Sequence, residues 1–288
     1  MTTGACTYAL TCSASTLRNA DMPQRLTAAY GAGFTGLGLR LVDHRASGLA
    51  PAELLTGLQN HDLRLLELEH SWDWAAPTRD AAEDEIWALA DTVGFRQLNV
   101  SMFVEHPPLP ALADGFGALC DRAAKRGVLV ALEFMPFTAV RTLAEAAAVV
   151  RAAGRDNGGI LLDLWHWRRT SATVEDLAAV SPHWITALQL CEARVTALPD
   201  LREEARHHRE LPGRGMGASG ATASLVAAMA GLGLTCPVTV EMFSDELDAL
   251  PPPETANAAA AAGAEVLAAA GWAAGTWETN LETRGAAR

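Results

Sequence analysis

The sequence is poor in lysine and in basic charge of any kind. Lys125 is the single lysine among 22 basic residues, and 34 acidic residues give the chain a formal net charge of -12. Binding of a nucleic-acid backbone requires a concentrated basic surface, so we expect no nucleic-acid partner. The scarcity of lysine also argues against a lysine-based phosphate site.

Paired cysteines, a leader segment and long apolar runs are missing as well. The five cysteines form no CxxC pair; they are Cys6, Cys12, Cys120, Cys191 and Cys236. Scattered cysteines of odd number are typical of reduced thiols in a cytoplasmic protein. The N-terminal stretch MTTGACTYALTCSAS has neither the basic nor the apolar segment of a signal peptide. Apolar runs elsewhere are broken by charge or glycine before they reach membrane-spanning length. We therefore expect a cytoplasmic protein with no membrane partner.

Strand-like and helix-like segments alternate along the chain. The predicted strands are 6–12, 36–41, 63–69, 97–103, 128–134, the start of 158–167, 185–191 and 238–243. The predicted helices are 21–30, 51–60, 78–93, 109–126, 142–153, 173–180, 218–230 and 254–269. Repeated strand–helix units predict an α/β protein with a (β/α)8 barrel over residues 1–271, followed by a C-terminal tail over 272–288. The rival fold is a doubly wound open sheet, but the glycine-rich phosphate turn typical of it is not found after the first strand.

Oxygen-bearing side chains stand in the second half of four consecutive predicted strands. They are Glu133 in VLVALEF, Asp163 in GGILLD, Gln189 in ITALQLCEA and Glu241 in PVTVEMF. The C-terminal ends of barrel strands meet at one rim, and a buried carboxylate without a partner is costly. A hard divalent cation satisfies all four together. We predict one such ion, Mg²⁺ or Mn²⁺ in the first place, with Co²⁺ or Zn²⁺ as alternatives.

The strand ends ALEF, LLDLWH, LQLCEA and VEMF, in this order, resemble those of the xylose isomerase-like TIM barrels, the sugar phosphate isomerase/epimerase superfamily. The resemblance extends from the GLGLRL strand to the last helix. It implies that Glu133, Asp163, Gln189 and Glu241 are metal ligands and that His166 contacts the substrate. Many sugar epimerases have His where this chain has Gln189, and the Gln variant is similar to the 3-dehydroshikimate dehydratase branch.

The chemistry expected at this rim is proton transfer beside a carbonyl group. A divalent ion chelated by a carbonyl and a neighbouring hydroxyl acidifies the adjacent C–H, and a carboxylate base then removes the proton. We assign catalytic roles to Glu133, Glu241 and His166, and expect a metal-dependent isomerase or epimerase that works through an enediolate. The alternatives are a dehydratase (a lyase) that forms protocatechuate and a non-catalytic barrel that serves as a binding subunit. A DNA-repair endonuclease of the same fold is disfavoured by the acidic charge.

Four residues are predicted to contact the substrate, a small polyhydroxylated ketone. Arg209 and Arg206 lie in RHHRELPGRG, which resembles the family's Arg followed by a Pro-Gly-x-Gly loop. Arg214 stands in that loop where the family often has an acidic residue, and it is an additional candidate for an anion contact. His70 and Asn99 follow earlier strands and are expected to face the same rim. Homo-oligomers are common among such barrels, so a homo-oligomer is the expected assembly.

Overall fold

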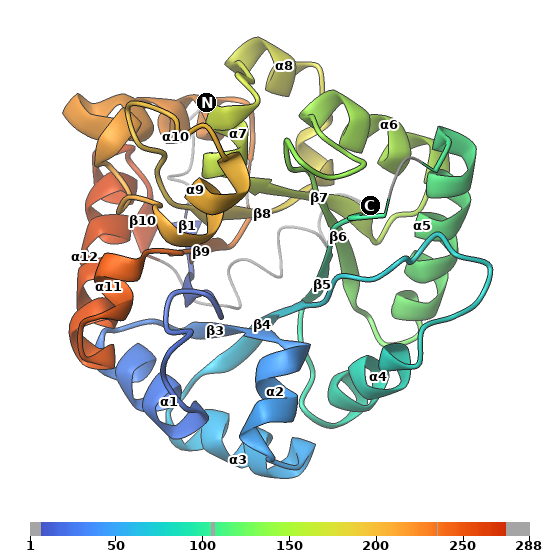
Figure 1. Ribbon diagram of the computed structural model, residues 1–288, viewed down its shortest axis with the longest axis horizontal. Coiled ribbons are helices and arrows are strands. Elements are labelled where there is room, and N and C mark those ends of the chain that lie inside the picture. Colours follow the sequence, from blue (N-terminus) through green and yellow to red (C-terminus); the bar gives the residue numbers. More distant parts are fainter. Residues whose placement is uncertain (1–6, 105–106, 235, 275–288) are drawn as a thin grey trace.

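The computed structural model describes residues 7–104, 107–234 and 236–274. Within these residues, eight parallel strands close into a barrel in which each strand pairs with the next along the chain and the last pairs with the first (Figure 1). The barrel strands are β2 (Leu10–Cys12), β3 (Gly36–Arg40), β4 (Arg64–Glu69), β5 (Gln97–Val100), β6 (Leu129–Glu133), β7 (Gly158–Asp163), β8 (Ile185–Leu190) and β9 (Val238–Val240). The predicted (β/α)8 barrel is confirmed.

Helices follow the strands, and most of them surround the ring of strands on its outer side (Figure 1). They are α1 (Met22–Gly31), α2 (Leu41–Ser47), α3 (Pro51–Asn60), α4 (Ala82–Thr92), α5 (Leu109–Ala124), α6 (Leu143–Ala153), α7 (Leu164–Arg169), α8 (Val174–Ala178), α9 (Leu201–His207), α10 (Ala221–Gly231), α11 (Asp245–Asp248) and α12 (Pro252–Ala269), with two 3-10 turns, η1 (Pro182–Trp184) and η2 (Gly215–Gly220). Local sequence explains several helix ends: Asp21 and Thr142 cap α1 and α6 with their side chains, and Gly154 closes α6 in a left-handed conformation. Among the described helices, none has the length and hydropathy needed to cross a membrane.

Short elements account for most differences from the expected pattern. The segment after β8, predicted as a polar loop, contains the helix α9, and the helix α2 follows β3 without a loop. The predicted strand 6–12 is two strands, because only β2 joins the barrel, while β1 (Thr7–Tyr8) pairs in parallel with β10 (Ala273–Ala274). The start of the predicted tail is therefore paired with the N-terminal segment. Cys6 and residues 275–288 lie outside the described residues.

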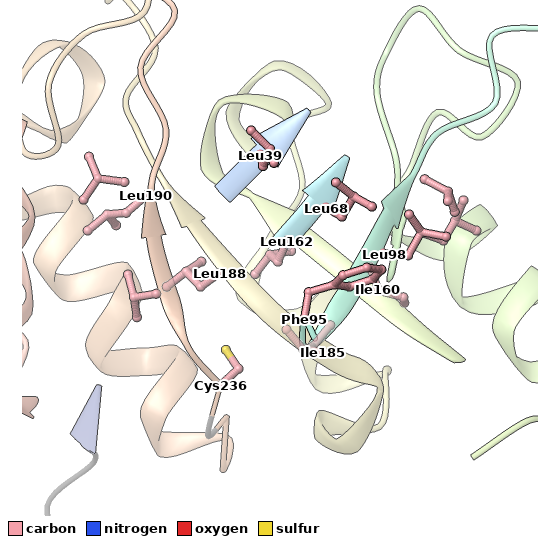
Figure 2. Packing of buried hydrophobic residues seen from close by; sticks show 14 of the residues in the cluster. Leu39, Leu68, Phe95, Leu98, Ile160, Leu162, Ile185, Leu188, Leu190 and Cys236 are labelled. Carbon is pink, nitrogen blue, oxygen red and sulfur yellow. The ribbon is translucent and has the colours of Figure 1, made fainter. Parts of the chain in front are cut away.

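The two faces of each barrel strand carry different kinds of side chain. Leu68, Leu98, Leu162 and Leu188 belong to the large apolar core between strands and helices, part of which Figure 2 shows. Residues at alternating positions point to the other face, into the barrel. Except for Leu161, the buried residues found in that interior are small or polar. They include Ala131, Ala187, Thr11, Glu67, Gln97, Asn99, Gln189 and Thr239. Barrel interiors are more often filled with bulky branched side chains. Here polar side chains fill the interior beneath the C-terminal rim, and we call this layer, which includes Glu67, Gln97, Gln189 and Thr239, the barrel floor.

Candidate active site

A cavity of about 530 Å³ opens at the C-terminal ends of the barrel strands. Its lining includes the three predicted catalytic residues and the four predicted substrate-binding residues: Glu133, His166, Glu241, His70, Asn99, Arg206 and Arg209. The other two predicted metal ligands, Asp163 and Gln189, are buried more deeply, with 0% and 1% of their surface exposed. The fold thus gathers the predicted catalytic residues, metal ligands and substrate-binding residues at one rim, but not the additional candidate Arg214.

Three of these side chains lie close enough together to hold a cation. Ligand atoms of Glu133, Asp163 and His166 are all within 4.8 Å of one another, and His166 Nε2 is 3.4 Å from Glu133 Oε1. The local chain geometry explains the pairing, since Asp163 caps α7 and its Oδ1 accepts the His166 backbone N–H at 2.9 Å. Neither ring nitrogen of His166 has a hydrogen-bond partner among the described residues.

Arg209 lies among the predicted metal ligands. Its Nη1 donates to Asp163 Oδ2 at 2.6 Å and to Glu241 Oε2 at 2.8 Å, while its Nε donates to the Ala205 carbonyl at 2.8 Å. The Phe243 ring covers the guanidinium at 4.9 Å, and only 3% of the side chain is exposed. The charge of Arg209 therefore already compensates two of the clustered carboxylates. A contact between Arg209 and the substrate stays a prediction.

The titration of the cluster follows from burial and from this arginine. Burial, reinforced by the neighbouring charge of Asp163, raises the pKa of Glu133 to about 8. Burial also raises the pKa of Glu241 above its usual range, although Arg209 opposes the shift. For Asp163, burial acts in the same direction, but Arg209 and His166 outweigh it and hold the pKa below its usual range. Burial lowers the pKa of His166 to about 4. The site therefore combines a neutral imidazole, an ionised aspartate and two carboxyl groups, Glu133 and Glu241, whose pKa values are raised above the usual range.

Glu67 is a buried residue of this region that the sequence analysis did not select. Its Oε1 accepts the Thr239 hydroxyl at 2.9 Å, and its Oε2 accepts Gln189 Nε2 across the barrel at 3.5 Å. Gln189 is the donor of this second bond, so its amide nitrogen faces Glu67 and its Oε1 faces away. The Gln189 Oε1 atom is then left buried with no partner in the described chain. The sequence signal for it is strand alternation: Glu67 lies two residues before Glu69, a residue of the cavity lining at the end of β4, and therefore on the same face of that strand.

We expect Glu67→Gln to change how stability depends on pH. Burial raises the pKa of Glu67 from 4.5 to about 7, so between these values the folded protein holds a proton that the unfolded chain releases. Protonated Glu67 therefore gives its full contribution to the free energy of unfolding below pH 4.5. As pH rises through about 7 this contribution is lost, and the free energy of unfolding falls by up to about 3 kcal/mol. Urea unfolding of wild type and variant from pH 4 to pH 8 should show that the variant loses less stability as pH rises. Parallel curves would contradict the assignment.

The remaining predicted residues differ in their surroundings. His70 stacks on Trp72 with ring centroids 5.2 Å apart, and Arg206 is exposed at the mouth of the cavity. Arg214 faces Glu265 of α12 at 3.4 Å on the surface, outside the cavity lining. Ser13, which the sequence analysis did not select, donates its hydroxyl to Glu241 Oε1 at 3.1 Å.

A closed barrel of parallel strands with a carboxyl-lined cavity at its C-terminal rim defines the chain as a TIM barrel. Residues 26–270 match the model of one family, described as Xylose isomerase-like TIM barrel. The chain belongs to this family.

Two curated relatives share sequence with this chain, and a solved structure shares its fold. A 3-dehydroshikimate dehydratase of Pseudomonas aeruginosa is 32% identical over 142 residues, which cover 49% of this chain and 22% of that protein. An inosose isomerase of Bacillus licheniformis is 30% identical over 151 residues, which cover 52% of each chain. The match thus spans about half or less of the length of these relatives. The crystal structure of the IOLI protein with a binding zinc atom has the same fold, with a TM-score of 0.78 at 21% identity over 90% of this chain and 98% of that one.

Proposed function

We propose that this chain is a divalent-metal-dependent isomerase or epimerase that transfers a proton beside the carbonyl of a small polyhydroxylated ketone. The observation that carries the proposal is the group of Glu133, Asp163 and His166 within 4.8 Å, at the edge of a cavity large enough for a sugar-sized molecule. The similarity to an inosose isomerase supports the class of substrate. A cytoplasmic location and a homo-oligomer stay predictions.

The residues present fit a hard cation. Gln189 Oε1 is buried without a hydrogen-bond partner in the described residues, as an atom that binds a cation would be, and the ring nitrogens of His166, which also lack one, remain available to a substrate. We propose that Glu133, Asp163, Gln189 and Glu241 hold one ion, Mg²⁺ or Mn²⁺, with Zn²⁺ and Co²⁺ as alternatives. The ion would polarise the substrate carbonyl and so acidify the neighbouring C–H.

The protein side chains then have separate tasks. Glu133 is the general base that removes the proton from the carbon beside the carbonyl. In the metal-free protein burial raises its pKa to about 8, and a bound cation would favour the ionised form that a base requires. Glu241, three strands away on the ring, returns a proton to the enediolate. The neutral imidazole of His166 donates an N–H to the oxygen on which negative charge develops. Arg209 keeps Asp163 ionised and fixes its distance from Glu241.

A dehydratase is the second candidate. Loss of a hydroxyl group from the same enediolate gives an alkene and, from 3-dehydroshikimate, the aromatic product protocatechuate. Two observations favour it: the glutamine at position 189 and the 32% identity to a 3-dehydroshikimate dehydratase.

The two candidates differ in product, and one assay separates them. Metal-free protein is loaded with Mn²⁺ or Mg²⁺ and is given inosose or 3-dehydroshikimate in parallel. We expect an isomeric ketone from inosose if the first proposal holds, and the ultraviolet absorbance of protocatechuate if the second does. Tight metal binding with no product from either ketone, or from a panel of ketoses, would contradict both and favour a binding subunit.

A further inference from the structure

A chain of hydrogen bonds in the barrel floor fixes which way the Asn99 amide points. Arg96 Nη1 donates to Gln97 Oε1 at 2.6 Å, and Gln97 Nε2 donates to Asn99 Oδ1 at 2.7 Å. A guanidinium group has no acceptor, so Gln97 must present its oxygen to Arg96 and its nitrogen to Asn99. Asn99 in turn must accept with its oxygen. An amide group has nearly the same shape in either orientation. The donor character of Arg96 therefore decides which atom of Gln97 and which atom of Asn99 faces its neighbour.

The consequence is a hydrogen-bond donor at the cavity wall. Asn99 lines the cavity with only 4% of its surface exposed, and its Nδ2 is buried with no partner among the described residues. A buried amide N–H that stays unpaired loses its hydrogen bond to water without compensation, so such a group is expected to have a partner in the working state.

An unpaired oxygen lies on the neighbouring strand. Glu69 of β4 is the direct register partner of Asn99 on β5, and both side chains line the cavity. Oε1 of Glu69 is also buried without a hydrogen-bond partner in the described part of the chain. Neighbouring strands lie about 5 Å apart, so the carboxyl group and the amide can reach one substrate atom.

We infer that Asn99 and Glu69 form a subsite that recognises one hydroxyl group of the ketone substrate, and that Arg96 and Gln97 are positioning residues that set its polarity. A hydroxyl accepts from Asn99 Nδ2 and bonds the Glu69 carboxyl at the same time, because it is both donor and acceptor. A substrate with a CH2 group in place of this hydroxyl would leave Asn99 Nδ2 and the Glu69 carboxyl unpaired. This inference rests on the proposed function and adds a requirement on the substrate: a hydroxyl facing β4 and β5, beside the strand that carries Glu133.

Gln97→Glu tests the relay without altering any residue of the cavity lining. The carboxylate introduced at position 97 still accepts from Arg96, but it now presents an oxygen to Asn99, so the Asn99 amide must turn and expose Oδ1 beside Glu69. We expect KM for the ketone that wild type turns over, inosose or 3-dehydroshikimate, to rise at least about 10-fold, with little change in Mn²⁺ affinity. Gln97→Met is the matched control. It leaves Asn99 free to turn either way, and we expect a rise in KM below about 3-fold.

Two further measurements keep the test independent of how well Gln97→Glu folds. Asn99→Asp replaces the donor directly and should raise KM at least as much as Gln97→Glu. On wild type, an inosose analogue that lacks the recognised hydroxyl should lose at least about 100-fold in kcat/KM, whereas analogues that lack another hydroxyl should lose less.

The outcomes separate this inference from the proposal on which it rests. If wild type turns over neither of these ketones nor any ketose of the panel, the proposed function fails and the inference fails with it. If wild type turns over a ketone but Asn99→Asp and a folded Gln97→Glu keep its KM, the inference alone is wrong. A similar loss in Gln97→Met and Gln97→Glu would also contradict it, because it would reveal a packing role in place of amide polarity.

Discussion

Replacement of Glu133 by Gln is expected to lower kcat by about 1,000-fold while the barrel remains folded. The amide keeps the shape of the side chain but cannot take up a proton, and general-base catalysis contributes about 100- to 10,000-fold. Because burial raises the pKa of Glu133 to about 8, the folded protein disfavours its charged form, so the neutral Gln should cost little stability. Turnover and thermal melting are measured on the same samples.

Glu246→Gln is the matched control for this prediction. Glu246 is exposed on α11, outside the cavity lining, so the variant loses one carboxylate without touching the site. We expect its kcat to equal that of wild type. A Glu133→Gln enzyme with wild-type kcat would show that Glu133 is not the base.

Arg209→Met is expected to destabilise the metal-free protein by about 3–5 kcal/mol. The arginine pairs with Asp163 and Glu241 at 2.6 and 2.8 Å, and all three side chains are buried. Removal of one partner from a buried ion pair leaves uncompensated charge in a poorly solvated place. Mn²⁺ bound by the same carboxylates would supply the missing positive charge. The loss of stability, measured by urea unfolding, should therefore be much smaller with Mn²⁺ than without it.

Arg206→Met is the comparison for this effect. Arg206 is three residues away in the sequence but is exposed, so we expect a change below about 0.5 kcal/mol. An equal loss of stability in Arg209→Met with and without Mn²⁺ would mean that the ion does not bind at Asp163 and Glu241.

The sequence predicted the rim because strand periodicity is a local property. An apolar run that ends in an oxygen-bearing residue places that residue at the C-terminal end of a barrel strand, and this placed Glu133, Asp163, Gln189 and Glu241 on one rim. The spacing of Asp163 and His166 was also informative, since one turn of α7 brings the imidazole back toward the carboxylates.

The interactions that tune the site could not be predicted in the same way, because they join distant segments. Glu67 and Gln189 meet across the closed barrel although they are 122 residues apart in the sequence. The orientation of Arg209 depends on α9, a helix of 7 residues that lies in a stretch predicted as a polar loop. Helices this short are not stable on their own and owe their formation to tertiary packing.

The orientation of the side-chain amides of Asn99 and Gln189 could not be predicted from the sequence either. Asn99 was selected as a rim residue, but whether it offers a donor or an acceptor depends on Arg96 and Gln97 through two successive hydrogen bonds. Gln189 presents its oxygen for a similar reason, since its nitrogen faces Glu67. In both cases a hydrogen bond with a buried side chain inside the barrel, from Gln97 or to Glu67, determines which amide atom is available at the rim.

The most direct test of the account is hydrogen exchange at the carbon beside the ketone carbonyl. Metal-free protein is incubated with inosose or 3-dehydroshikimate in heavy water, with and without Mn²⁺, and the recovered ketone or product is examined by mass spectrometry. The account predicts that wild type with Mn²⁺ introduces deuterium at that carbon, and that metal-free protein and Glu133→Gln do not. Deuterium incorporation at the same rate without a divalent ion, or in Glu133→Gln, would contradict it.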